Sequence, residues 1–181
     1  MNIYAVHQNP VIAARSLCDK HLSKMAVASC QMLSTALIKN NINESKLPLT
    51  QKGRPYKKAF PDHPCTIWVG ETQANYRWLC LHALALTTEY KKRYKKIHTS
   101  RASIQQLCGL IEYIPIGEQT PFVRAINKYE YPILNDEKTW GSVVLAYRAY
   151  YMLDKRNFAK WGEGRNPPVW WNPDFKLEVK Q

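Results

Sequence analysis

Two long stretches with helical periodicity constrain the fold of this chain more than any other feature. The first begins at Asn9-Pro10, where an N-cap residue precedes a proline suited to the first helical position, and it continues to about Lys39 with a kink near Asp19. The second covers residues 66–96. In both, apolar side chains recur every three or four residues, as they do on the core-facing side of a helix. The sequence therefore predicts a mainly α-helical fold.

Shorter patterns fill the rest of the chain. Further helices are predicted over residues 103–113 and 139–161, and residues 3–6 are compatible with one short N-terminal strand. The stretch 40–64 is polar and rich in proline, which indicates a long loop of the kind that often serves function. With 181 residues the chain has the size of one domain with a core. We expect a single α-helical domain, 1–181, with about four main helices and long ordered loops.

The cysteines and the apolar segments indicate in which cellular environment the protein works. Five cysteines form no C-x-x-C pair, so neither a disulfide framework nor a zinc ribbon is predicted, and the thiols are expected to be buried. No apolar run approaches the roughly 18 residues of a membrane span, and residues 1–6 do not resemble a signal peptide. We therefore expect a cytoplasmic protein that has no membrane partner.

The histidines give no indication of a metal site. His7, His21, His63, His82 and His98 lack the H-x-x-x-H and H-E-x-x-H spacings that bind zinc on a helix. The sequence also contains no glycine-rich phosphate loop and no G-x-S-x-G elbow. We expect neither a metal nor another cofactor.

The excess of positive charge points to an anionic partner. The formal net charge is +12, from 26 lysines and arginines against 14 acidic residues. The stretches 46–58 and 91–101 hold several cations and no acidic residue. Either stretch alone is compatible with a solvated surface, but both together, beside many aromatic residues, favour a partner that carries phosphates. Such a partner is a nucleotide or a nucleic acid.

Three polar clusters, each with a histidine, interrupt the apolar segments. They are Lys20-His21 with Lys24, residues 62–64, and residues 89–98. Cations and imidazoles are costly to bury unless they are paired or hold a ligand. Lys20 and Lys24 lie one helical turn apart, which suits them to clamp a phosphate. The alternative is a surface pair of lysines beside a half-buried His21.

Two helical stripes combine polar with apolar residues. On the first helix, Lys20, Lys24, Val27 and Gln31 share one side, which is not a plain surface because Val27 interrupts it. A stripe on the second helix mixes polar and aromatic groups as the wall of a pocket would, and it consists of Glu71, Asn75, Trp78, His82, Ala85, Glu89 and Arg93. The candidates for stacking a base in such a pocket are Trp68, Trp78 and Tyr147.

Catalytic interpretations compete with structural ones at the histidines. His63 precedes a helix start and is suited either to proton transfer or to fixing the loop. The spacing from Arg93 to His98 resembles the R-x4-H signature of HEPN-type ribonucleases, but Glu89, four residues before Arg93, predicts a plain salt bridge. A nucleophilic pair of Cys65 with a histidine is disfavoured, because no helix N-terminus clearly lowers the pKa of that thiol.

A set of motifs extends over nearly the whole chain. It comprises Asn9-Pro10-Val11, Lys20-His21-x-x-Lys24-Met25, Gln31, His63-Pro64-Cys65-x-x-Trp68, Asn75-Tyr76-x-Trp78-Leu79, Glu89-Tyr90-x-x-Arg93-Tyr94-x-Lys96-x-His98-x-Ser100, Ala146-Tyr147-Arg148-x-Tyr150-Tyr151 and Ala159-Lys160-Trp161. Together these motifs resemble those of a widespread family of small, mostly uncharacterised proteins of tailed bacteriophages. The resemblance implies a protein that works in the cytoplasm of an infected bacterial host, and it implies no settled activity.

The chain departs from the pattern of that phage family at several places. Ala28 and Ala36 lie near positions where relatives often carry an acid or another polar group, and Gly70 replaces an expected arginine. Asn127-Lys128-Tyr129 lacks an expected acidic pair. Missing carboxylates weaken an acid–base mechanism, whereas the cationic and imidazole groups remain. These departures favour ligand capture over catalysis.

We therefore expect the protein to bind a small phosphate-bearing nucleotide and, in the phage setting, to sequester a host immune signal. Tight capture requires a preorganised pocket but no catalysis. The residues expected to contact the ligand are Lys20, His21, Lys24, His63, Trp68, Asn75, Trp78, Glu89, Arg93, Lys96, His98, Tyr147 and Arg148. We also expect a homo-oligomer.

Two alternatives remain open. The first is a nucleic-acid-acting enzyme, with a base-excision, base-modifying or ribonuclease activity, which uses the same basic surface. In that enzyme His63 or His98 acts as general acid or base with Glu71 or Glu89 as its partner. The second is a basic adaptor that binds DNA or a host enzyme without a pocket. Binding to a polymer predicts a steep fall of affinity with salt, and capture of a small nucleotide predicts a shallower one.

Overall fold

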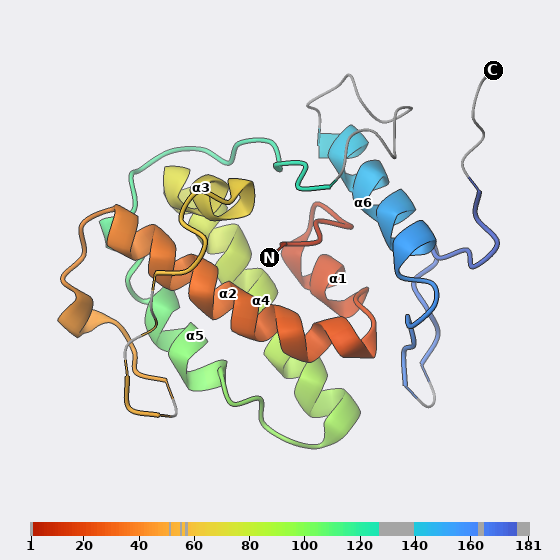
Figure 1. Ribbon diagram of the computed structural model, residues 1–181, viewed down its shortest axis with the longest axis horizontal. Helices are drawn as coiled ribbons and strands as arrows, with labels where there is room; N and C mark the ends of the chain where they lie inside the picture. The colour runs from red at the N-terminus through yellow and green to blue at the C-terminus, as the bar shows by residue number, and fades with distance from the viewer. Residues whose placement is uncertain are drawn as a thin grey trace.

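The computed structural model describes residues 2–50, 52–54, 56, 58–126, 140–162 and 165–176. Within these ranges the chain forms six α-helices and two short 3-10 helices (Figure 1). They are α1 Pro10–Arg15, α2 Asp19–Lys39, η1 Glu44–Lys46, α3 Pro64–Glu71, α4 Gln73–Tyr94, α5 Arg101–Cys108, η2 Ile111–Tyr113 and α6 Trp140–Asp154. The predicted mainly α-helical fold is confirmed, and the described ranges contain no strand.

The N-terminal segment is buried but does not form the predicted strand. Ile3, Ala5 and Val6 are buried, yet Tyr4 has a left-handed φ of 43°, and the N–H of Val6 donates to the carbonyl of Tyr4 over 2.7 Å. The side chain of Asn2 fixes this bend, because its oxygen accepts from the N–H of Tyr4 at 2.9 Å. A backbone bent in this way cannot present a row of groups for strand pairing. The strand prediction is therefore wrong.

Both long helical stretches are divided in two. The first breaks after α1, and α2 begins at Asp19, where the kink was predicted. The second breaks at Thr72, which has an extended backbone, with φ −142° and ψ 153°, between α3 and α4. The hydroxyl oxygen of Thr72 accepts from the N–H of Asn75 at 3.1 Å and so caps α4. A capping threonine thus interrupts a periodicity that continues on both sides of it.

The later helices are shorter than their predicted ranges. The stretch predicted as one helix over residues 103–113 is α5 followed by η2, and α6 ends at Asp154 rather than near residue 161. The chain after α6 packs back on the N-terminal part of the protein. The indole of Trp161 donates to the carbonyl of Ser16 at 3.1 Å, and the ring of Trp171 lies 4.8 Å from that of Trp161.

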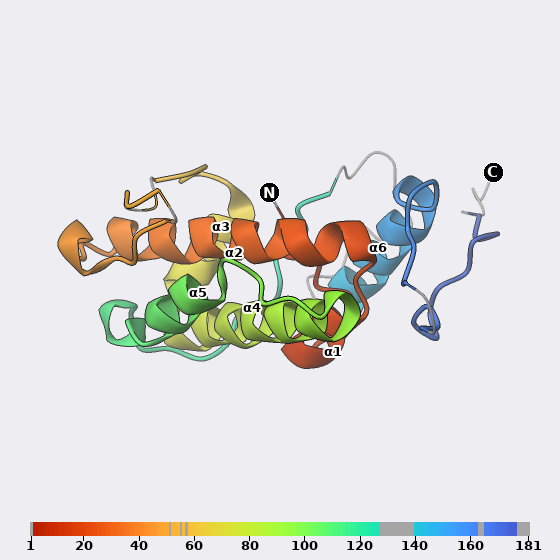
Figure 2. The ribbon, with the colours of Figure 1, turned by 90° about the horizontal axis from the view of Figure 1, so that it is seen from below.

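Helices α2 and α4 form the centre of the core. They lie against each other, α1 and α5 pack on α4, and α3 packs on α2 (Figures 1 and 2). Figure 2 shows α2 in one layer and α4 with α5 in another. The side of α2 that faces α4 is apolar, and its large buried residues are Leu22, Met25, Met32, Leu33 and Leu37. Helices α3 and α5 also cover α2, and residues 32–37 are all buried, so the exposed side of α2 lies in its N-terminal half, at Lys20, Lys24 and Val27.

No described helix combines the length and apolar character needed to cross a membrane. All five cysteines are free thiols, and four of them, Cys18, Cys30, Cys65 and Cys80, are buried. Burial raises the pKa of the Cys65 thiol to about 11, so this group stays protonated at neutral pH and is unsuited to act as a nucleophile. Among the residues that the structure describes, no group of three potential metal ligands gathers.

Candidate nucleic-acid interface

Arg93 holds the ends of three helices together. Its Nη1 donates to the carbonyl of Leu17 at 3.0 Å and to Oδ1 of Asp19 at 2.7 Å, and its Nη2 donates to the carbonyl of Arg15 at 3.1 Å. Its Nε donates to Oε1 of Glu89 at 3.1 Å. The side chain of Arg93 is only 4% exposed. The guanidinium therefore ties the end of α1 and the start of α2 to α4, and its donors are directed into the protein.

Glu89 is a buried acceptor in the same cluster. Its side chain is 2% exposed and accepts from Arg93 and also from Nη1 of Arg165, which comes from the C-terminal part of the chain. The predicted salt bridge between Glu89 and Arg93 is therefore present. A buried carboxylate shared by two guanidinium groups stabilises the fold through charge-assisted hydrogen bonds.

The R-x4-H spacing reflects local structure in this protein. His98 is buried, its Nδ1 accepts from the N–H of Ser100 at 3.1 Å, and its Nε2 lies 3.4 Å from the hydroxyl of Ser23. Burial lowers the pKa of His98. Arg93 binds a different set of groups, whereas Lys96 lies exposed between the two. The arginine and the histidine thus have separate structural partners.

His21 is a neutral core histidine. Its ring stacks on Tyr4 with 4.6 Å between centroids, and its Nδ1 lies 2.8 Å from the hydroxyl of Tyr151. That hydroxyl also accepts from the N–H of Cys18 at 2.9 Å, so Tyr151 ties the histidine to the start of α2. Burial, aided by nearby lysines, lowers the pKa of His21 to about 4. The imidazole is uncharged at neutral pH and supplies no cation to a phosphate.

His63 is the N-cap of α3. It is half-buried, and its Nδ1 accepts from the N–H of Cys65 at 3.1 Å. A carboxylate partner was predicted at Glu71, but this residue lies at the opposite end of α3, about 12 Å away along the helix axis at 1.5 Å per residue. The structure therefore does not pair these two residues through a direct contact.

The tryptophans predicted to stack a base lie inside the core. Trp68 is 1% exposed and donates to the carbonyl of Thr120 at 3.3 Å, and Trp78 is 3% exposed and donates to the carbonyl of Gln8 at 2.6 Å. Asn75 is also buried, and its amide nitrogen donates at 2.8 Å to the carbonyl of Trp68 and at 2.8 Å to the hydroxyl of Thr120. Trp68 and Asn75 thus attach the loop around residue 120 to α3 and α4, and Trp78 attaches α4 to the segment before α1.

Tyr147 attaches α6 to residues 123–125, and Arg148 attaches it to the N-terminal segment. Tyr147 is fully buried, and its hydroxyl donates to the carbonyl of Val123 at 2.9 Å and accepts from the N–H of Ala125 at 3.1 Å. Arg148 donates to the carbonyl of Val6 at 2.8 Å, and burial lowers its pKa. Most of the predicted ligand contacts are thus contacts within the protein.

The mixed stripe of the first long helix does lie at the surface. Lys20 and Lys24 are exposed, Val27 is 42% exposed and Gln31 is half-buried. We call these four residues the outer stripe of α2. Three of them, Lys24, Val27 and Gln31, line an open hollow of about 390 Å³ together with Ala28 and Phe60. This hollow combines a cation, an amide and an aromatic ring.

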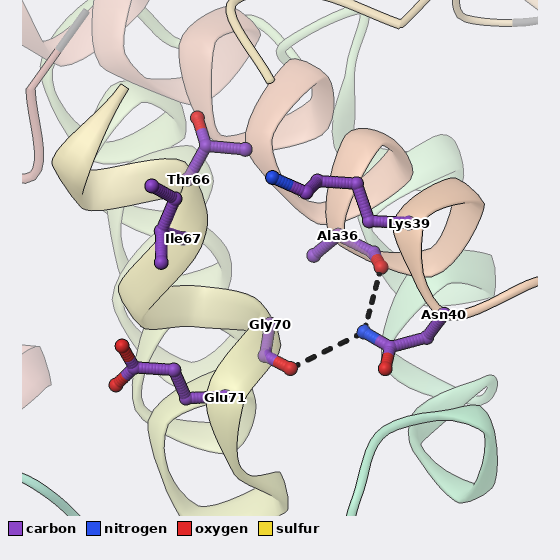
Figure 3. A pocket seen from close by; sticks show the side chains of 7 residues that line it. All are labelled: Ala36, Lys39, Asn40, Thr66, Ile67, Gly70 and Glu71. Carbon is purple, nitrogen blue, oxygen red and sulfur yellow. Dashed lines mark hydrogen bonds between the residues drawn. The ribbon is translucent and has the colours of Figure 1, made fainter. Parts of the chain in front are cut away.

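A second hollow of about 210 Å³ lies between α2 and α3 (Figure 3). Lys39 contributes from α2, Asn40 from the C-cap of α2, and Gly70 and Glu71 from α3. The amide nitrogen of Asn40 bridges the helices by donating to the carbonyls of Ala36 at 2.9 Å and Gly70 at 3.2 Å. Glu71 lines the edge of this hollow, but its exposed carboxylate points away from α2 (Figure 3) and accepts a hydrogen bond of 3.3 Å from the hydroxyl of Thr120.

The sequence interpretation missed Phe60 and Lys39. Phe60 is 64% exposed, and it follows the basic stretch that contains Lys52, Arg54 and Lys58. An isolated aromatic residue at the end of a cationic loop was the available signal. Lys39 lay at the predicted end of a helix, where a cation has an ordinary structural explanation in the helix dipole.

A helical protein with a cationic outer face and an open hollow of nucleobase size has the features of a nucleic-acid-binding protein. A family model described as pyrimidine dimer DNA glycosylase matches residues 1–102, which is more than half of the 181 residues. The chain therefore belongs to the pyrimidine dimer DNA glycosylase family. No curated protein sequence and no solved structure matches it.

This membership corrects the main expectation from the sequence. Capture and sequestration of a free nucleotide was expected, but the family is one of nucleic-acid-acting enzymes, as in the first alternative. The physical reason for the error lies in the polar clusters. Arg93, Glu89 and His98 were interpreted as groups that await a ligand, whereas their partners are other parts of the chain. The membership is compatible with the resemblance to small phage proteins, and the expected homo-oligomer stays a prediction.

Proposed function

We propose that the protein is a DNA glycosylase that excises damaged pyrimidines from duplex DNA, with the duplex lying across the outer stripe of α2. The observation that carries the proposal is the family match, which covers α1 to α4 and includes every residue of both hollows. An enzyme that acts on a base in a duplex must reach it from outside the helix, and this requires a charged surface with a receptive hollow.

The charge of α2 supports binding of a polymer. Lys20 and Lys24 are exposed one helical turn apart on this helix, within the outer stripe. Lys52, Arg54 and Lys58 add cations from the loop that ends at α3. A duplex on this face would release counterions, and its affinity would fall steeply with salt.

The two hollows suit one bound duplex. Ala28 lines the first hollow and Ala36 the second, so the hollows are about 12 Å apart along α2. A duplex that crosses α2 would cover both. The first hollow, at about 390 Å³, lies in the lower part of the size range of small-molecule sites.

Glu71 is our candidate for proton transfer. Of the four predicted catalytic residues, His98 and Glu89 are buried, His63 is half-buried, and Glu71 is exposed and lines the second hollow. Excision by water breaks the bond between C1′ and the base, forms a bond from C1′ to oxygen and transfers one proton from water to the departing base. A carboxylate assists this reaction by accepting the proton of the water.

The test is an excision assay with the full chain. A labelled duplex with a single pyrimidine dimer, and an undamaged duplex of the same sequence, are incubated with the protein and then treated with hot alkali, which breaks strands at abasic sites. We expect breaks at the dimer and none in the undamaged duplex. Intact damaged strands at protein concentrations that saturate binding would contradict the proposed function.

A further inference from the structure

Phe60 presents an aromatic ring to solvent at the edge of the first hollow. It is 64% exposed, although a ring of this size is normally covered in a folded protein. The neighbouring wall of the hollow is partly apolar, with Val27 at 42% exposure and Ala28 beside it. Phe60 and this wall together offer a flat apolar group a surface on which to stack.

The backbone on both sides of Phe60 is anchored to α2. The N–H of Ala59 donates to the hydroxyl oxygen of Thr35 at 2.9 Å, and that hydroxyl donates to the carbonyl of Ala59 at 3.3 Å. On the other side, Nζ of Lys39 donates to the carbonyl of Pro61 at 2.9 Å. The segment 59–61 is thus fixed at two successive turns of α2.

The conformation of Phe60 itself is strained. Its φ is +49°, in the left-handed region that a residue with a large side chain seldom adopts. The carbonyl of Phe60 accepts from the N–H of His63 at 3.1 Å, which closes a turn directly before α3. Strain of this kind persists only where the surrounding structure enforces it, and it is frequent at binding sites. The anchors therefore hold the exposed ring in position before any partner arrives.

Charge around the ring identifies the kind of partner. Lys24 lines the hollow, Lys20 is one turn away on α2, and Lys58 precedes Phe60 by two residues. Gln31, in the same hollow, supplies an amide donor and acceptor suited to the edge of a base. The acid nearest in sequence, Asp62, is paired with Lys39 at 3.7 Å. An aromatic surface beside cations complements a group that is flat, polar at its edge and bonded to phosphates. A nucleobase of DNA has all three properties.

We propose that Phe60 stacks on a base that has left the DNA helix and entered the hollow beside α2. This inference rests on the proposed function, because it requires that the protein bind duplex DNA and unstack it. Lys24 and Lys20 would contact the flanking phosphates, and Gln31 would contact the edge of the base. Phe60 would stabilise the unstacked state and so favour binding at a damaged, weakly stacked step.

The experiment compares three substitutions of Phe60 with one control. Phe60→Ala removes the ring, Phe60→Leu keeps an apolar side chain without an aromatic face, and Phe60→Tyr keeps the aromatic face. The control is Leu81→Ala on α4, because Leu81 is 46% exposed and lines a different surface near α1. Dissociation constants for the dimer-containing and undamaged duplexes are measured by fluorescence anisotropy at several salt concentrations. Thermal melting establishes that each variant is folded.

Stacking predicts a specific order among the variants. Phe60→Ala and Phe60→Leu should both weaken binding to the damaged duplex by about 5- to 100-fold, and Phe60→Tyr should stay within about threefold of the wild type. The slope of affinity against salt should be unchanged, because no phosphate contact is lost. Leu81→Ala should bind as the wild type does.

Two results would overturn the inference while leaving the proposed function intact. In the first, Phe60→Ala excises and binds the damaged duplex as Leu81→Ala does. In the second, Phe60→Leu retains full affinity, which would make the residue an apolar wedge rather than a stacking partner. Failure of the proposed function shows in the wild type alone, as an absence of binding and excision, or as binding of free nucleotides only, and it overturns both proposals.

Discussion

Replacement of Arg93 distinguishes a structural arginine from a phosphate ligand. The structure buries this guanidinium against Glu89, Asp19 and the carbonyls of Arg15 and Leu17. Arg93→Met keeps much of the length of the side chain and removes every charge-assisted hydrogen bond. We expect a large loss of stability and, in the folded protein, little change in affinity for DNA.

The magnitude follows from the partners that remain. Loss of one member of a buried ion pair typically costs about 3–5 kcal/mol of unfolding free energy. Glu89 would still be bound by Arg165, and Asp19 is 24% exposed and regains some water, so the lower end of that range applies. We therefore expect a loss of about 3 kcal/mol. With a urea dependence of about 2–3 kcal/mol per molar for a chain of this size, the unfolding midpoint should fall by roughly 1 M.

The assay is urea unfolding followed by tryptophan fluorescence, together with anisotropy titrations against duplex DNA without denaturant. Lys96→Met is the matched control, because it removes an exposed cation two residues beyond the end of the same helix. This control should change the unfolding free energy by less than about 0.5 kcal/mol. An unchanged midpoint for Arg93→Met, combined with a large loss of DNA affinity, would refute our reasoning and make Arg93 a contact to DNA.

Three further predictions concern binding, chemistry and pH. The double substitution Lys20→Ala and Lys24→Ala should reduce the slope of log affinity against log salt by about 2, measured by anisotropy, and an unchanged slope would place the duplex elsewhere. Glu71→Gln should lower the excision rate by about 100-fold or more in single-turnover assays while binding is retained, and wild-type rates would exclude its role in proton transfer. Burial lowers the pKa of His21 to about 4 and that of His82 to about 3. Below about pH 6.5 the unfolded chain therefore binds protons that the native chain does not. The free energy of unfolding should fall as the pH is lowered from about 6.5 towards 4. Urea midpoints at pH 7 and pH 4.5 test this, and the fall should become smaller when His21 and His82 are replaced by Gln and Phe.

The helical fold follows from the sequence, and the ends of its helices do not. Apolar periodicity predicts that α2 and α4 are helices, because burial of one side of a helix imposes that spacing. The break at Thr72 depends on a single hydroxyl that accepts from the N–H of Asn75, and such a cap leaves the apolar pattern unchanged. The bend at Tyr4 depends on the side chain of Asn2 and has no periodic signal either.

The candidate site was predictable only where its residues are close in the sequence. Lys20, Lys24 and Val27 share a helical side, and the apolar residue within a cationic stripe indicated a special surface. Arg93 shows the opposite case, because its partner Leu17 lies 76 residues away, and the sequence does not indicate whether a polar residue is already paired. Phe60 joins the hollow through a long loop, whose path the spacing of residues does not determine.

Hydrogen bonds between residues far apart in the sequence determine when, during synthesis, the core can form. Tyr151 binds His21 and Cys18, and Arg165 binds Glu89. Cys18, His21 and Glu89 leave the ribosome long before Tyr151 and Arg165 do. A nascent chain grows from its N-terminus at about 5–20 residues per second, so α1, α2 and α4 spend several seconds without these contacts. Within that interval Glu89 has no contact from Arg165 and the imidazole of His21 has no contact from Tyr151. The core therefore reaches its final packing only after Tyr151 and Arg165 have left the ribosome, and nascent chains that lack these residues should be more sensitive to protease than the folded protein.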